Sequence, residues 1–116
     1  MDERLKKALD FANYRQTFAI QRKVLKETVD SELTYGYSGG IFKIDRALLT
    51  FVQLLIDQGR IENVPLIDIN DNPILIDNLE KFKTEIFDRY FSATYRYLES
   101  YNKLKKSRSV EKLVDL

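Results

Sequence analysis

Alternating oxygen-bearing side chains at Asp68, Asn70 and Asn72 resemble the opening of a calcium-binding EF-hand loop. The similarity ends there, because Pro73 replaces the glycine of the sharp turn and Leu79 replaces the bidentate glutamate that closes such a site. The flanking residues also favour strands rather than helices. We therefore interpret this stretch as a turn and expect no metal ion or other cofactor. Calcium binding is the alternative.

Acid–base catalysis would need two carboxylates in one pocket, and this region offers Asp68, Asp71 and Asp77. Nothing in their spacing places two of them together, and Asp77 is expected to cap a helix. The chain contains no histidine and no cysteine, which excludes Ser-His-Asp and Cys-His nucleophilic sites and thiol catalysis. We therefore expect that the protein is not an enzyme and has no catalytic residues.

Basic residues and tyrosines alternate near the C-terminus, a composition that single-strand binders use for phosphate contact and base stacking. The residues expected to contact a nucleic acid are Arg96, Lys103, Lys105, Lys106 and Arg108, interleaved with Tyr95, Tyr97 and Tyr101. Aromatic residues at helical spacing also form cores, and basic residues near a helix C-terminus also favour its dipole. Nucleic-acid binding is accordingly the alternative function.

The elements that would position these residues begin with a central helix over residues 45–59. Between Ala47 and Ile56 only Thr50 and Gln53 are polar, so this helix is apolar nearly all round and is expected to be covered on several sides. Asp45 is a suitable N-cap, and Gly59 supplies the left-handed residue that ends a helix.

Two long helices are predicted, over residues 2–33 and from Asp77 to about Lys106. The first carries an apolar stripe of Phe11, Tyr14, Phe18, Leu25 and Val29, widened by Ile20 and Val24. The second carries a stripe of Leu79, Phe82, Ile86, Tyr90, Ala93, Tyr97 and Leu104, with Phe87, Phe91, Leu98 and Tyr101 beside it. Residues 107–116 are expected to form a loosely docked tail.

Hairpins are predicted on either side of the central helix. The first turns at Ser38-Gly39-Gly40, and the second turns over residues 70–73. A strand separates the glycines from the central helix, so they cannot place backbone amides at that helix's N-terminus to bind phosphate.

The resulting fold class is α+β and helix-dominated: two long antiparallel helices, with a short buried central helix and two β-hairpins forming a head. At 116 residues we expect a single domain, 1–116. Each long helix would run about 45 Å, which exceeds the roughly 35 Å diameter of a compact chain of this length. A two-helix pair buries one face of each helix, so a homodimer or larger homo-oligomer is expected. The expected interface residues are Phe11, Tyr14, Phe18, Phe87, Tyr90 and Phe91.

The chain carries 19 basic and 18 acidic residues, so its net charge of +1 gives no overall attraction to nucleic acid or to a membrane. We find no signal peptide and no transmembrane run, and the lack of cysteine fits a reducing cytosol. We therefore expect an intracellular protein without membrane association.

Both ends of the chain also carry a resemblance. The opening Met-Asp-Glu-Arg-Leu-Lys-Lys-Ala-Leu-Asp-Phe and the ending Arg-Ser-Val-Glu-Lys-Leu-Val-Asp-Leu are similar to those of small proteins encoded by contractile-tailed phages of marine cyanobacteria. The resemblance implies the cytoplasm of a bacterial host, with association to the virion as a further option, and it transfers no activity. The leading hypothesis is therefore a non-catalytic interaction or assembly protein that self-associates through its long helices.

Overall fold

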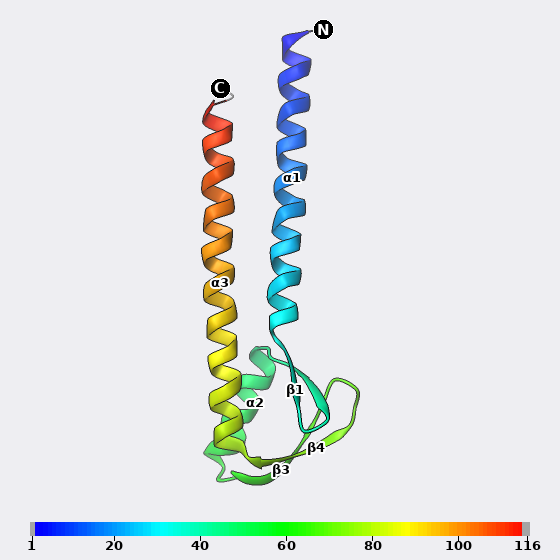
Figure 1. The fold of residues 1–116 in the computed structure, drawn as a ribbon, viewed down its shortest axis with the longest axis vertical. Coiled ribbons are helices and arrows are strands. Elements are labelled where there is room, and N and C mark those ends of the chain that lie inside the picture. Colours follow the sequence, from blue (N-terminus) through cyan, green and yellow to red (C-terminus); the bar gives the residue numbers. More distant parts are fainter. Residues whose placement is uncertain (1, 115–116) are drawn as a thin grey trace. The chain divides into compact units, whose positions relative to one another are not determined.

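The computed structural model describes residues 2–114, with side chains described for residues 2–106. Three helices and four strands follow one another along the chain (Figure 1). The helices are α1 (Glu3–Glu32), α2 (Arg46–Asp57) and α3 (Leu79–Val114), and the strands are β1 (Thr34–Tyr37), β2 (Gly40–Lys43), β3 (Glu62–Ile67) and β4 (Pro73–Asn78). The predicted helix-dominated α+β class, with two long helices and two hairpins, is confirmed.

The chain divides into two compact units. Unit 1 combines α1 up to Val29 with α3 from Tyr95, and unit 2 comprises residues 30–94. Within unit 1, α1 and α3 lie side by side and run in opposite directions (Figure 1). The third helix is longer than predicted, because it continues through residues 107–114 instead of ending near Lys106.

Helix ends in unit 2 follow the expected capping chemistry, with one correction. The Asp45 carboxylate accepts the Leu48 backbone N–H at 2.8 Å, which confirms Asp45 as the N-cap of α2. Gly59 adopts φ 80° after the helix, as predicted. The predicted cap at Asp77 is wrong by one residue: Asn78, the last residue of β4, directly precedes α3, and its side-chain oxygen accepts the Lys81 N–H at 3.1 Å.

Each hairpin is an antiparallel two-stranded sheet, and a direct bond joins them. β1 pairs with β2 across a turn in which Ser38 and Gly39 have φ values of 49° and 83°. β3 pairs with β4. The Ile69 N–H donates to the Ile41 carbonyl at 2.9 Å, which connects the loop of the second hairpin to β2. A side chain at Gly40 would meet Ile74, since an added Cβ would lie 2.5 Å from its Cγ1 atom.

The core of unit 2 is built around Phe82 on α3. Its ring lies 5.3 Å from that of Tyr37, 5.4 Å from that of Phe42 and 6.1 Å from that of Tyr35, all on the first hairpin. Edge-to-face and tilted pairs at these separations add stabilisation beyond the buried area. Further fully buried side chains are Ile44, Val52, Ile76, Leu79 and Ile86. Both hairpins, α2 and the start of α3 therefore share one hydrophobic core.

Helix α2 is buried on one side only. Leu49 and Val52 face the core, whereas Phe51 and Leu54 remain 45% and 54% exposed. The prediction that this helix is covered on several sides is therefore wrong for the single chain. The physical reason is that unit 2 offers one packing surface to α2, and no other element of unit 2 covers the apolar residues on the opposite face.

We expect Phe82→Ala to destabilise unit 2 strongly, because it removes a buried ring that three other aromatic rings contact. Phenylalanine-to-alanine changes in cores cost about 3–5 kcal/mol. Urea unfolding followed by circular dichroism measures this change. Phe51→Ala is the matched control, since its ring is half exposed, and it should cost less than about 1 kcal/mol. Equal losses from both variants would contradict the assignment of Phe82 to the centre of the core.

Candidate interaction surfaces

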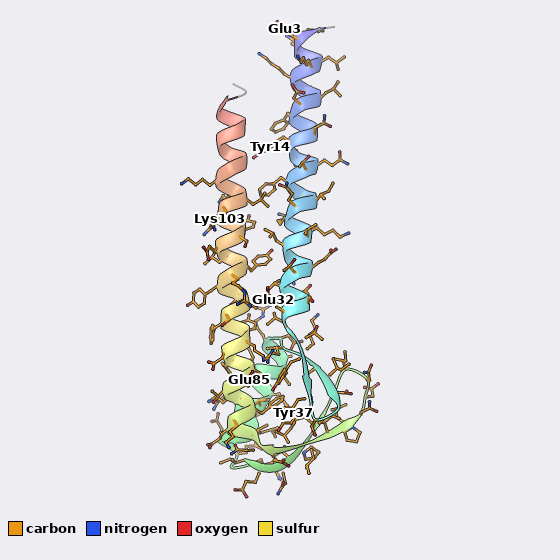
Figure 2. The ribbon with its side chains drawn as sticks, viewed as in Figure 1. Glu3, Tyr14, Glu32, Tyr37, Glu85 and Lys103 are labelled. Carbon is orange, nitrogen blue, oxygen red and sulfur yellow. The ribbon has the colours of Figure 1, made fainter. Side chains whose placement is uncertain are left out.

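Helix α1 carries one apolar face directed at α3. The Phe18 ring contacts the Tyr101 ring edge-on with 6.4 Å between centroids, and Tyr101 stacks on Tyr97 at 6.3 Å. Figure 2 shows the Tyr14 side chain on the same side of α1, directed toward α3. Leu25 is half-buried on this face as well. These residues account for the packing of α1 on α3 within unit 1.

A second apolar stripe lies on the outer side of α1, and we call it the outer seam. It comprises Leu5, Leu9, Ile20 and Val24, which are all between 47% and 54% exposed. At 100° per residue these positions centre roughly 150° around the helix from Tyr14, Phe18 and Leu25. The prediction that Ile20 and Val24 widen the inner stripe is therefore wrong, because they belong to the opposite side of α1.

Leu5 and Leu9 lie outside the apolar stripe that the sequence predicts for this helix. The signal that identifies them is their spacing, since Leu5 and Leu9 are four residues apart and so are Ile20 and Val24. The exposed polar residues Asn13 and Gln16 fill the intervening turns of the same face. Spacings of three and four residues are typical of a helix that packs lengthwise on another helix.

The predicted interface residues have different surroundings. Phe18 and Tyr14 are partly covered within the chain. Phe11 is about half exposed. Its ring stacks on that of Tyr14 with 6.5 Å between centroids and lies under the Arg15 guanidinium. In unit 2, Phe91 is half exposed and contacts both Phe87 and Tyr90, and the Lys83 ammonium lies 5.7 Å from the Phe87 ring. A role in an interface between chains stays a prediction for all six.

The predicted nucleic-acid residues lie on exposed parts of α3. Arg96, Lys103, Lys105 and Lys106 are all exposed, whereas Arg108 and the rest of the predicted tail 107–116 lie outside the residues whose side chains are described. Lys103 pairs with Glu99 at 3.5 Å, a solvated contact worth little. Among the interleaved tyrosines, Tyr97 and Tyr101 stack on each other and are partly covered, so Tyr95, 67% exposed, is the ring left open to a base.

Charge is divided unequally between the two units. The residues of unit 1 include 13 Lys and Arg against 7 Asp and Glu, a formal charge of +6. The residues of unit 2 include 6 against 11, a charge of −5, and the two values add to the +1 of the whole chain. Near-neutrality of the chain therefore hides a basic helical unit and an acidic unit, each of which creates its own local potential.

An apolar groove of about 390 Å³ lies in unit 2 between α2 and the hairpins. Its apolar lining includes Phe42, Leu48, Phe51, Pro65, Leu66, Ile67 and Ile69, and Lys43, Asp45 and Asp68 supply polar atoms. Ile67 and Ile69 are more than half exposed at its edge. The groove continues the uncovered side of α2, so unit 2 also presents apolar surface to solvent.

The oxygen atoms of Asp68 are used by backbone donors. One carboxylate oxygen accepts the N–H groups of Asn70 and Asn72 at 3.0 and 2.9 Å, and the other accepts the Ile41 N–H at 3.0 Å. The bond from Ile41, followed by that from Asn72, lowers the pKa of Asp68 against the opposing effect of burial. The Asp68 carboxylate therefore shapes its turn and ties it to β2, and Asn70 and Asn72 contribute backbone N–H groups to these bonds.

The described part of the chain does not bring together the carboxylates that were considered for acid–base catalysis or a set of side chains suited to a metal ion. Asp71 and Asp77 are exposed, and no cluster of three or more acidic, histidine or cysteine residues suited to a metal ion occurs among the described residues.

Searches with protein-family models, curated protein sequences and solved structures find no match to this chain. None of the described helices combines the length and the apolar content that crossing a bilayer requires.

We expect the stability of the protein to fall more steeply in acid than that of an Asp68→Asn variant. Because the pKa of Asp68 is lowered in the folded state, its stabilising effect is present above the ordinary value of 3.8 and is lost as the pH falls through the folded pKa. Thermal unfolding at several pH values below about 4 measures the difference. At neutral pH, Asp68→Ala should lower the melting temperature by several degrees, since three backbone N–H groups lose their acceptor.

Asp71→Asn is the control for this experiment, because it removes a carboxylate from the same turn whose side chain is exposed. Its acid profile should follow that of the unchanged protein. A profile for Asp68→Asn that also follows the unchanged protein would contradict the assigned role of the Asp68 carboxylate.

Proposed function

We propose that this protein is a non-catalytic assembly protein that self-associates through its long helices, with the outer seam of α1 as the principal contact. One observation carries the proposal: α1 has apolar residues on two nearly opposite sides, and α3 covers one of them. A helix in an isolated pair needs a single apolar stripe, whereas a helix in a bundle of four buries residues toward two neighbours. A second copy of the chain supplies the missing neighbour.

The dimensions of the outer seam suit such a contact. From Leu5 to Val24 the seam runs about 28 Å along α1 at 1.5 Å per residue. Each of its four side chains has roughly half of its surface left to bury, which is worth on the order of 1 kcal/mol per side chain. A symmetric pair buries two copies of the seam, so both chains contribute equally.

Self-association of unit 1 has an electrostatic consequence. Each copy carries a charge of +6 on this unit, so the two copies repel each other until salt screens the repulsion. Association driven by an apolar seam between like-charged units should therefore strengthen as the salt concentration rises.

The second candidate function is nucleic-acid binding by unit 1, and the charge of +6 on this unit favours it. The exposed residues Arg96, Lys103, Lys105 and Lys106 would contact phosphates, and Tyr95 would stack on a base. Salt separates this function from the first, because the release of counterions makes nucleic-acid binding weaker as salt rises.

The proposed setting follows the resemblance to proteins of contractile-tailed phages. We place the assembly in the cytoplasm of an infected bacterial cell. Detection of the protein in purified virions would instead place it in the particle.

We expect a concentration-dependent mass above that of the 13.7 kDa chain, with a dissociation constant that decreases between 50 and 300 mM salt. Leu9→Ala should weaken association about 30-fold, because the dimer loses the burial of two side chains, about 2 kcal/mol in all. Sedimentation equilibrium measures both effects. Leu75→Ala is the matched control, since Leu75 is an equally exposed leucine in unit 2, and it should leave the mass unchanged. A mass equal to one chain at every concentration and salt would overturn the proposal.

If unit 1 binds nucleic acid instead, a fluorescently labelled single-stranded oligonucleotide should bind at 50 mM salt and dissociate well below 300 mM. A Lys103→Glu, Lys106→Glu variant should then lose binding at least tenfold, because it replaces two phosphate contacts by repulsion. Leu9→Ala should leave this binding unchanged. No shift in anisotropy with any oligonucleotide at 50 mM salt would exclude the second candidate.

A further inference from the structure

We infer that the outer seams of two copies pack antiparallel, with a two-fold axis passing between Tyr14 and Arg15. The inference rests on the proposed self-association and specifies its partner surface, orientation and register. Its basis is the order of residues along the face of α1 that carries the outer seam, where the exposed Asn13 and Gln16 stand between the apolar residues: Leu5, Leu9, Asn13, Gln16, Ile20 and Val24. The successive spacings of four, four, three, four and four residues read the same in both directions.

An antiparallel pair centred on this axis matches like with like. Leu5 of one copy lies opposite Val24 of the other, and Leu9 lies opposite Ile20. The same operation places Asn13 opposite Gln16. A two-fold interface requires that when one residue contacts a second, the second contacts the first across the axis, and all six positions meet this condition.

The central polar pair supplies the register. The amide side chains of Asn13 and Gln16 each carry donors and an acceptor, so they can bond reciprocally across the interface. A slip of four residues would place either Asn13 against Ile20 or Gln16 against Leu9, so that an amide faces an apolar side chain. One polar layer in an otherwise apolar seam specifies register in helical pairs in this way, at some cost in stability.

The negative charge of unit 2 favours the antiparallel orientation of the two α1 helices. Every copy of α1 leads directly into unit 2 after Val29, and unit 2 has a charge of −5. A parallel pair would bring both of these junctions to the same end of the helices. An antiparallel pair separates the two junctions by roughly 40 Å along the helix axis, several times the screening length of about 8 Å at physiological salt. The dipoles of the two helices also point in opposite directions in the antiparallel pair, and this arrangement is electrostatically favourable.

Disulfide cross-linking tests the register, because the chain contains no cysteine of its own. A Leu9→Cys, Ile20→Cys variant should form a covalent dimer under mild oxidation, since residues facing each other across two packed helices meet the distance that a disulfide needs. Leu9→Cys alone should stay monomeric on a non-reducing gel, because its two copies would be roughly 16 Å apart along the axis. A Leu9→Cys, Val24→Cys variant, one turn out of register, should cross-link at least tenfold more slowly.

The outcomes separate the two levels of the proposal. Cross-linking by Leu9→Cys alone would establish a parallel pair and overturn this inference while leaving self-association intact. A dimeric mass without cross-linking in any of the three variants would remove the outer seam from the interface and overturn the inference. A monomeric mass would defeat the proposed function and this inference together. Rapid covalent dimerisation of Leu9→Cys, Ile20→Cys alone among the three variants supports the inference.

A second variant tests the role of the polar pair. Replacing both amides, as Asn13→Leu with Gln16→Leu, should strengthen dimerisation and relax the register, because the seam becomes uniformly apolar. The out-of-register pair Leu9→Cys, Val24→Cys should then cross-link at a rate within threefold of the in-register pair. Unchanged selectivity between these two pairs would overturn the assigned role of Asn13 and Gln16.

Discussion

Each helix of this protein buries only the face that another element covers, and this constraint governs both of its units. In unit 1, α3 covers the side of α1 that carries Tyr14 and Phe18. In unit 2, the core around Phe82 covers the side of α2 that carries Leu49 and Val52. The opposite sides of both helices are apolar and exposed. Within each unit taken by itself, the described residues provide no further element that covers these sides.

The unequal division of charge between the two units determines which partners the uncovered surfaces repel and which they attract. Unit 1 is basic and unit 2 is acidic, although the whole chain is almost neutral. The outer seam lies on the basic unit, so a second copy must overcome repulsion, whereas a polyanion would be attracted. Added salt therefore strengthens self-association and weakens nucleic-acid binding. The negative charge of unit 2 separately favours an antiparallel arrangement of two α1 helices, because that arrangement keeps the two copies of unit 2 apart.

The turn at Asp68 illustrates how a ligand-like pattern arises from backbone requirements. A tight loop leaves several N–H groups without partners in the sheet, and a carboxylate at its first position can accept them. Asp68 accepts two from its own loop and one from β2. Asn70 and Asn72 contribute backbone N–H groups to these bonds, so an alternation of oxygen-bearing residues does not by itself distinguish a turn from a metal site.

Local chemistry in the sequence was sufficient to predict the elements. The cap at Asp45, the left-handed Gly59 and the two turns act within a few residues, so the bounds of α2 and both hairpins could be predicted. The error at Asp77 was of one residue, because Asn78 is an equally good cap and directly precedes Leu79, where α3 begins. Which apolar residues are covered could not be predicted, because burial depends on neighbours distant in the chain. Helical spacing alone places Ile20 and Val24 away from the inner stripe. Only the tertiary structure decided which side of α1 is covered by α3 and left Phe51 and Leu54 exposed, since α3 and the unit 2 core each present one packing face.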